Sequence, residues 1–361
     1  MLAQSHFFCK SFDLIPPPSQ VSRSTTFSLN LSSSRSSRFS FLPSPASANL
    51  VSGGRVSSTM VSSSKRPDLS EEFQSELNAN DLDRFAAVGN ALADASGEVI
   101  RKYFRKKFDI VDKDDMSPVT IADQMAEEAM VSIIFHNFPS HAIYGEEKGW
   151  KCKEESADYV WVLDPIDGTK SFITGKPVFG TLIALLYKGK PVRSPDSVVV
   201  YKLPMFVILG IIDQPILKER WIGMSGRRTK LNGEEISTRS CPILSQAYLY
   251  TTSPHLFSEE AEKAFARVRD KVKMPLYGCD CYAYALLASG YVDLVIESGL
   301  KPYDFLALVP VIEGAGGTIT AWNSKPLLWE ASSTAVATSF NVVAAGDSDI
   351  HQQALESLEW Q

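Results

Sequence analysis

The segment WVLDPIDGTKSF, at residues 161–172, is the feature that most constrains the fold. Its apolar beginning predicts a buried strand, because strands covered on both faces are written as continuous apolar runs. The run ends in two carboxylates, Asp164 and Asp167, with Pro165 between them and Gly168 after them. The proline fixes a turn, and the glycine lets the backbone approach a ligand closely. Because α/β folds place their sites at strand ends, the turn predicts a site here.

Apolar periodicity predicts an alternation of helices and strands on both sides of this segment. The predicted helices are 81–103, 121–135, 258–272, 282–290 and 304–316, and the predicted strands are 141–147, 159–164, 179–191, 209–215, 220–224, 247–252, 292–297 and 341–346. This order predicts an α/β or α+β sandwich in one domain, residues 67–361. We expect an N-terminal α+β half over about 80–245 and a C-terminal α/β half over about 246–361.

Further carboxylates stand at predicted strand ends or helix starts, namely Asp123 in VTIAD, Glu146 in YGEE and Asp304 in KPYDF. If these groups converge, their charges repel one another unless cations neutralise them, and oxygen ligands without His or Cys favour magnesium. Thr169 begins a predicted helix whose free N–H groups suit a phosphate. The pattern therefore predicts phosphoryl transfer to water, although DPIDG taken by itself is equally compatible with a capped turn.

The motifs WVLDPIDGTKSF, YGEE and Tyr303-Asp304 resemble those of the inositol monophosphatase-like superfamily, over about residues 81–351. The resemblance implies a layered αβαβα sandwich, a homodimer, and two to three Mg²⁺ ions per chain. It implies direct metal ligands at Glu146, Asp164, the Ile166 carbonyl, Asp167 and Asp304. It also implies that Asp123 and Thr169 orient the attacking hydroxide, and that Asp167, Gly168 and Thr169 contact the substrate phosphate. Lys113 resembles a lysine that, in this family, precedes the loop containing the SPVT segment. Its other interpretation is a solvated surface lysine.

Two segments bear on the substrate, a small phosphate monoester. DDMSPVTIAD and GCDCYAYALLASG resemble the histidinol-phosphate phosphatase branch of this family. That resemblance implies a plastid enzyme of histidine synthesis, with inositol monophosphates as secondary substrates. Asp280 and Glu297 would bind the protonated amine and the imidazole of L-histidinol phosphate, because charge-assisted contacts favour cations in an anionic pocket. Asp280 has a second interpretation, as the N-cap of the helix that follows it.

Several alternatives remain open at this point. The chain could be an inositol-1-phosphate phosphatase proper, a bisphosphate nucleotidase or a plastid fructose bisphosphatase, although the cysteine-bearing loop expected of the last is not found. A hypothesis from another class is a catalytically silent relative that acts as an interaction module. Loss of a metal carboxylate would indicate it, and every expected carboxylate is present.

Charge and composition narrow the partners. The formal net charge of -6 and the absence of a basic cluster argue against nucleic acid, because phosphate backbones need arrays of Lys and Arg. No apolar run reaches the length of a membrane span. The five cysteines are odd in number and irregularly spaced, which predicts no disulfide framework.

Residues 1–66 differ from the rest of the chain. They are rich in serine, and Asp13 is their only acidic residue, whereas Arg23, Arg35, Arg38 and Arg55 are scattered through them. This composition is typical of an organelle transit peptide and predicts the chloroplast stroma, with a disordered tail as the alternative.

Segment 192–207, VRSPDSVVVYKLPMFV, interrupts the family pattern where a tight hairpin turn is expected. Three interpretations compete: a tolerated surface loop, an extra strand at a dimer edge, or translated intron sequence. If the segment disturbs folding, the chain would be a catalytically impaired relative. Its apolar residues would be an aggregation hazard if exposed together.

Overall fold

The computed structural model describes residues 79–107, 110–112, 118–154, 157–188, 192–193, 200–201 and 205–360. These residues belong to one compact unit, Lys65–Gln361. The predicted transit peptide, 1–66, and Lys113 lie outside the described residues.

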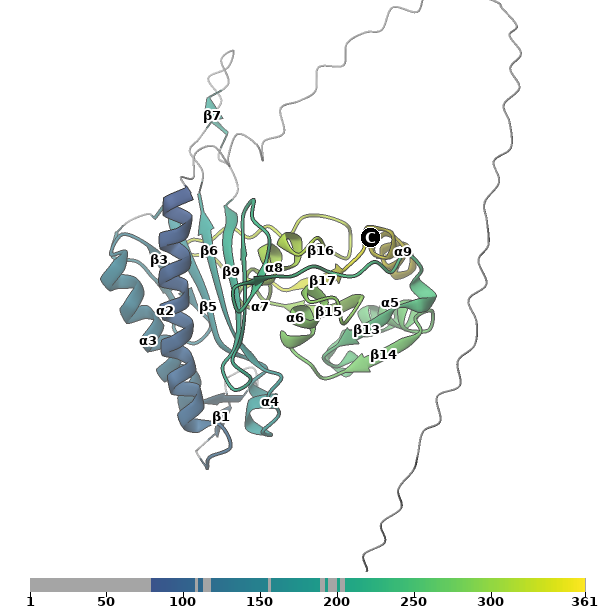
Figure 1. The fold of residues 1–361 in the computed structure, drawn as a ribbon, viewed down its shortest axis with the longest axis horizontal. Coiled ribbons are helices and arrows are strands. Elements are labelled where there is room, and N and C mark those ends of the chain that lie inside the picture. The colour runs from purple at the N-terminus through teal and green to yellow at the C-terminus, as the bar shows by residue number, and fades with distance from the viewer. Residues whose placement is uncertain are drawn as a thin grey trace, which may run out of the picture. The chain divides into compact units, whose positions relative to one another are not determined.

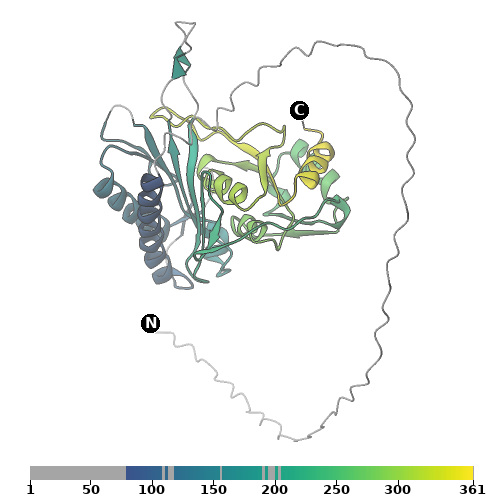
Figure 2. The same cartoon turned by 45° about the horizontal axis from the view of Figure 1, so that its top comes forward.

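Two β-sheets and three helical layers alternate through the molecule (Figure 1). Helices α2 and α3 cover one face of the first sheet, α6, α7 and α8 lie between the sheets, and α5 and α9 cover the far face of the second sheet. The same order of layers is visible after a 45° rotation (Figure 2). The helices are α2 (Ala79–Tyr103), α3 (Ile121–Asn137), α4 (Thr169–Ile173), α5 (Glu259–Arg269), α6 (Tyr282–Ala288), α7 (Pro302–Phe305), α8 (Leu308–Gly314) and α9 (Ser348–Leu358), with short 3₁₀ turns at Leu244–Gln246 and Pro254–Leu256. The predicted αβαβα sandwich is confirmed.

The first sheet has the strand order β12-β11-β10-β9-β6-β5-β3-β4. Its strands are β3 (Ala142–Gly145), β4 (Gly149–Lys151), β5 (Tyr159–Asp167), β6 (Gly180–Tyr187), β9 (Phe206–Gln214), β10 (Glu219–Met224), β11 (Lys230–Leu231) and β12 (Glu234–Glu235). All neighbours pair antiparallel except β3 and β5, which are parallel. Every residue of β6 is buried, because helices lie on both faces of the sheet.

The second sheet has the order β14-β13-β15-β17-β16. Its strands are β13 (Tyr248–Thr251), β14 (Met274–Tyr277), β15 (Leu294–Leu300), β16 (Thr318–Ala321) and β17 (Phe340–Ala345). β13 runs parallel to β14 and β15, whereas β17 is antiparallel to β15 and β16. A small separate pair, β1 (Ile110–Asp112) and β2 (Pro118–Thr120), leads into α3.

The elements differ from the sequence prediction in a few places. The single helix predicted over 304–316 is two helices, α7 and α8, with a break after Phe305. Pattern reasoning missed β14 and β16, because their short, half-exposed stretches carry weak periodicity, and it also missed α9, although the buried residues of α9 recur at helical spacing.

The predicted insertion, 192–207, is longer than the segment that leaves the sheet. Phe206 and Val207 belong to β9 and pair with Tyr187 and Leu186 of β6, and Met205 is buried. The sheet takes up these residues because their apolar side chains continue the buried strand. Val192–Arg193 (β7) and Val200–Tyr201 (β8) form an antiparallel pair, and the rest of the segment lies outside the described residues.

Candidate active site

Strand β5 contains an irregularity at the DPID turn. Asp164 of β5 pairs with Leu182 of β6. The next residue of β5 that pairs with β6 is Asp167, which lies opposite Gly180. Three steps along β5 thus oppose two along β6, which is a β-bulge. Pro165 carries no N–H for the ladder, and the Ile166 N–H instead donates to Asp164 Oδ1 at 3.0 Å. Residues three apart in a regular strand face opposite sides of the sheet, so the bulge lets both aspartates face the same side.

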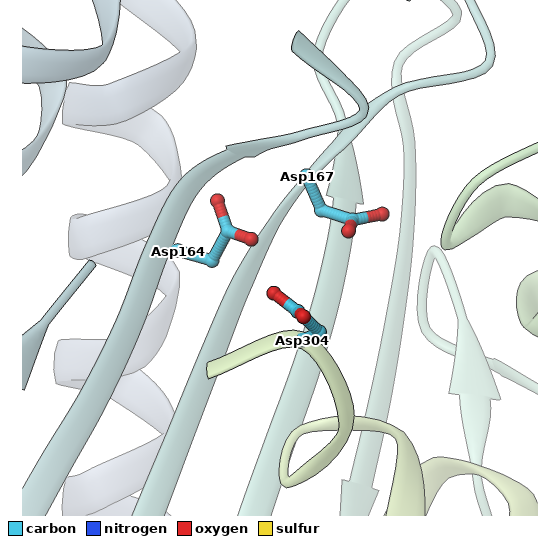
Figure 3. A group of neighbouring side chains, drawn as sticks. All are labelled: Asp164, Asp167 and Asp304. Atoms are coloured by element: carbon cyan, nitrogen blue, oxygen red, sulfur yellow. The ribbon is translucent and has the colours of Figure 1, made fainter. Parts of the chain in front are cut away.

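The two aspartates meet Asp304, which comes from α7 in the other half of the chain (Figure 3). One carboxylate oxygen from each of the three lies within 4.8 Å of the others. Burial, and then the charges of Glu146, Asp167 and Asp304, raise the pKa of Asp164 well above its usual range. Burial followed by the charge of Asp280 raises the pKa of Asp167 to about 7. A cluster that resists ionisation in this way is stabilised by a bound cation.

Asp304 lies at the start of α7, where its position is fixed by the backbone. The Lys301 N–H donates to Asp304 Oδ2 at 2.7 Å, and Pro302 occupies the first position of the helix, where its missing N–H costs nothing. The side chain of Tyr303, which precedes it, stacks with Tyr144 at a centroid distance of 6.4 Å.

Glu146 directly follows β3, and its charge is one cause of the raised pKa of Asp164. The Glu146 N–H donates to the Leu163 carbonyl at 3.0 Å, which extends the parallel pairing of β3 and β5. Glu127, a residue that sequence reasoning missed, supports the same loop: its Oε2 accepts the Glu147 N–H at 2.8 Å.

Asp123 begins α3 and is fully buried. Its Oδ2 accepts the Thr120 N–H at 2.9 Å and the Thr120 hydroxyl at 2.5 Å, a capping-box arrangement. Its Oδ1 lies 3.5 Å from the hydroxyl of Thr169, which also lies 3.1 Å from the Ile166 carbonyl oxygen. Burial raises the pKa of Asp123 to about 6. A carboxylate with a pKa near neutral pH is suited to accept a proton as a general base.

A cavity of about 430 Å³ opens next to the aspartate cluster. Its lining includes Asp167 and Asp304 of the cluster, and also Asp280 and Glu297. A larger hollow, of about 730 Å³, lies beside Met205 and Arg227, but none of the predicted site residues lines it. The chemistry therefore places the candidate substrate pocket in the smaller cavity.

Asp280 is brought to the pocket by the loop before α6. Its carboxylate accepts the Ser171 hydroxyl at 2.5 Å, and the N-cap of α6 is Cys281. Asp280 is therefore not the helix cap of its second interpretation. Its pKa is raised, chiefly by burial.

Glu297 lies on β15 and is held at both oxygens. Oε1 accepts the Thr252 N–H at 2.5 Å, and Oε2 accepts the Thr251 hydroxyl at 3.2 Å. Burial nevertheless raises the pKa of Glu297 to about 8. Two carboxylates 17 positions apart in sequence, those of Asp280 and Glu297, thus line the same pocket.

Sequence reasoning missed the supporting residues, among them Thr120, Glu127, Ser171, Thr251 and Thr252. Only Thr120 carried a usable signal, because Thr followed three residues later by an acidic residue is typical of a capping box. The other contacts join distant parts of the chain and leave no local pattern. No histidine of the described residues lines this pocket; His141 accepts the Trp161 indole N–H at 3.1 Å.

Comparisons with known proteins identify the family of the chain. The profile of the inositol monophosphatase family matches residues 81–195 and 197–359. The chain is 81% identical, over the whole of both proteins, to the chloroplastic bifunctional phosphatase IMPL2 of Arabidopsis thaliana. It is 30% identical to the histidinol-phosphatase of Mycobacterium tuberculosis, covering 64% of this chain and 85% of that protein.

Two solved structures have a fold similar to that of this chain. An inositol monophosphatase from Zymomonas mobilis is 43% identical, with a TM-score of 0.64, and the match covers 79% of this chain and all of that one. A SuhB protein from Bartonella henselae is 21% identical with a TM-score of 0.65, covers 76% of this chain and 98% of that one, and supports the fold alone. Among the helices of the described residues, none is long and apolar enough to span a membrane. The chain belongs to the inositol monophosphatase family of phosphatases.

Proposed function

We propose that the protein is a Mg²⁺-dependent phosphomonoesterase that hydrolyses L-histidinol phosphate to L-histidinol and phosphate. The observation that carries this proposal is the pocket itself, in which Asp280 and Glu297 face the cavity that the aspartate cluster borders. L-Histidinol phosphate has an anionic end and a cationic end. The pocket offers both kinds of partner, because its lining combines Asp167 and Asp304 of the aspartate cluster with two further carboxylates, Asp280 and Glu297.

The cluster fits a hard divalent cation. Asp164, Asp167 and Asp304 supply only oxygen, their ligand atoms lie within 4.8 Å of one another, and their mutual repulsion needs compensation. Glu146 and the Ile166 carbonyl would complete the ligand set for two to three Mg²⁺ ions. When bound, the ions supply charge neutralisation for the phosphate and a water acidic enough to attack it.

The chain's own residues then orient the reactants. Asp123, held by two hydrogen bonds from Thr120, is placed to accept a proton, and the Thr169 hydroxyl lies between its carboxylate and the Ile166 carbonyl. Gly168 and Thr169 would present backbone N–H groups to the phosphate. Lys113, which lies outside the described residues, keeps its proposed role as a catalytic lysine before the SPVT segment.

Specificity would come from Asp280 and Glu297. An ammonium or imidazolium group donates charge-assisted hydrogen bonds to such carboxylates, each contributing about 1.5 to 3 kcal/mol. Bringing the cation close also lowers the pKa of Glu297, so the group ionises as the substrate binds.

Inositol monophosphates are the second candidate substrates. The 43% identity to an inositol monophosphatase and the bifunctional name of the Arabidopsis relative support them. Their hydroxyl groups can donate to the same carboxylates, but without the charge that makes these contacts strong.

The test is phosphate release by the full chain with Mg²⁺, comparing L-histidinol phosphate with inositol 1-phosphate. We expect kcat/KM to be at least about tenfold higher for L-histidinol phosphate, the effect of one such contact. Asp280→Asn should reduce that ratio, with a smaller loss of turnover on inositol 1-phosphate, because that substrate carries no positive charge. A preference for inositol 1-phosphate in the unmodified protein would make it an inositol monophosphatase proper.

The remaining assignments follow from the same relatives. We propose that residues 1–66 direct the protein to the chloroplast stroma and that residues 67–361 form the catalytic domain of a homodimer. Mass measurement of the mature protein from plastids, and sedimentation of the same material, test the cleavage and the dimer.

A further inference from the structure

The backbone of Asp280 has an uncommon conformation. Its φ is 44°, in the left-handed region that favours glycine and that Asp and Asn adopt at a smaller cost than other residues. Such strain persists only where surrounding contacts hold the residue in place, and it is concentrated at functional sites. The contacts that hold Asp280 therefore indicate what its position serves.

One hydrogen bond holds the Asp280 side chain. Ser171 Oγ donates to Asp280 Oδ2 at 2.5 Å, and of the described residues Ser171 is the only side chain that donates to this carboxylate. Ser171 lies on α4, directly after the DPIDG turn at residues 164–168, which we call the metal loop, and only 7% of its surface is exposed. The bond thus joins the first half of the chain to the loop before α6 in the second half.

The metal loop itself leaves room for the carboxylate. A Cβ added at Gly168 would lie 2.8 Å from Asp280 Oδ2, closer than real Cβ contacts allow. The Asp280 side chain is therefore packed against the loop that carries Asp167, with little freedom to turn. The charges of Lys176 and Lys170 also attract this carboxylate and favour its ionised form.

We propose that Ser171 is a positioning residue for substrate specificity: its hydroxyl fixes the Asp280 carboxylate at the pocket wall, where the cationic part of the substrate binds. This inference rests on the proposed function, because it assigns to Ser171 an effect on cationic substrates. Ser171 itself does not line the cavity and acts through Asp280.

The alternative is a purely structural bond that ties α4 to the α6 loop. The two roles differ in what a substitution changes. If the bond is only a structural tie, its loss should disturb the nearby metal loop and lower kcat for every phosphate ester. If Ser171 positions Asp280, its substitution should weaken the binding only of esters with a positive charge, and only when residue 280 carries a carboxylate.

The test is a double-mutant cycle in the full chain with Mg²⁺, using Ser171→Ala, Asp280→Asn and the pair. L-Histidinol phosphate is the cationic substrate and glycerol 2-phosphate the matched ester without a cation. We expect Ser171→Ala to raise KM for L-histidinol phosphate about five- to tenfold, with kcat and the glycerol 2-phosphate parameters within about twofold. In the Asp280→Asn background the same substitution should add nothing, because interacting residues are non-additive.

A conservative variant completes the test. Ser171→Thr keeps the hydroxyl and should keep KM near that of the unmodified protein. Equal losses from Ser171→Ala in both backgrounds, or equal losses with both esters, would overturn the positioning role and leave the structural one. An unmodified protein with no preference for L-histidinol phosphate over glycerol 2-phosphate would instead overturn the proposed function, and the inference with it.

Discussion

The backbone N–H of Cys281 donates to Oδ2 of Asp167 at 2.6 Å. Asp167 ends β5 in the first sheet, and Cys281 is the N-cap of α6, which packs between the two sheets. The bond therefore joins the metal loop to the loop that carries Asp280. Because the Asp167 carboxylate belongs to the aspartate cluster and also accepts this bond, the geometry of the cluster is coupled to that of the loop that carries Asp280.

Asp164→Asn should abolish most turnover without unfolding the protein. The substitution removes a predicted metal ligand. Replacing a residue that only supports a ligand lowers activity by up to about a hundredfold, so we expect the loss of a ligand itself to lower kcat by at least about a hundredfold. It also removes one charge from a crowded cluster, so the melting temperature in EDTA should stay level or rise. Phosphate release and thermal melting measure the two effects. Unchanged Mg²⁺-dependent activity would remove Asp164 from the site.

Glu127 should matter for its hydrogen bond and not for its charge. The side chain is fully buried, and its Oε1 has no hydrogen-bond partner among the described residues, although Lys151 Nζ lies 4.0 Å away. Glu127→Gln keeps an acceptor for the Glu147 N–H, so Mg²⁺ affinity should be retained. Glu127→Ala leaves that N–H unpaired, which costs about 1 to 3 kcal/mol of stability, and should weaken Mg²⁺ binding about 10- to 100-fold.

The neighbouring Glu128→Ala is the matched control for this series, because Glu128 is exposed and its ion pair with Lys148, at 3.5 Å, lies at the surface. Calorimetric titration with Mg²⁺ and denaturant unfolding supply the readouts. If Glu127→Gln weakens Mg²⁺ binding as much as Glu127→Ala, the charge of Glu127 is what matters, and our interpretation is wrong.

The metal-free protein should lose stability as the pH rises from about 5 to 8. Burial raises the pKa of Glu297 from 4.5 to about 8 and that of Asp167 from 3.8 to about 7. Between those values the folded state binds more protons than the unfolded state, so the free energy of unfolding falls with increasing pH. The loss begins near the lower pKa values and is complete above about 8.

Mg²⁺ should reverse this trend. Cations compete with protons for the same carboxylates, so the rise in melting temperature on adding Mg²⁺ should be larger at pH 8 than at pH 5.5. Thermal melting in EDTA and in excess Mg²⁺ at the two pH values checks both statements. A Mg²⁺ effect that is equal at both would show that protons and metal do not share the site.

Tyr284 and Tyr282 should respond oppositely to loss of the hydroxyl. The Tyr284 hydroxyl is buried without a hydrogen-bond partner among the described residues, whereas the Tyr282 hydroxyl donates to Glu219 Oε2 at 2.6 Å. Tyr284→Phe should therefore leave the free energy of unfolding unchanged or raise it, because an unpaired buried polar group is removed. Tyr282→Phe should lower it by about 0.5 to 1.5 kcal/mol. Denaturant unfolding of the two variants, which differ only in position on α6, decides the point; a destabilised Tyr284→Phe would contradict it.

The sequence by itself determined the class of fold and the ends of the strands at which the site lies. Helix α2 and strand β5 were predictable because their apolar residues repeat with the period of one element and need no distant partner to be recognised. The motif at Asp164 and Asp167 is local as well, since Pro165 dictates the bulge that turns both carboxylates to one side.

Only the tertiary structure decided which carboxylates meet. Asp304 joins the cluster because α7 packs near the end of β5, and Asp280 reaches the pocket because Ser171, 109 positions earlier, holds it there. Hydrogen bonds of this kind depend on the packing of two sheets through a shared helical layer, and no local pattern records them. The physical reason is that chain periodicity encodes which face of an element is buried, whereas the partners on that face are chosen by how the elements pack.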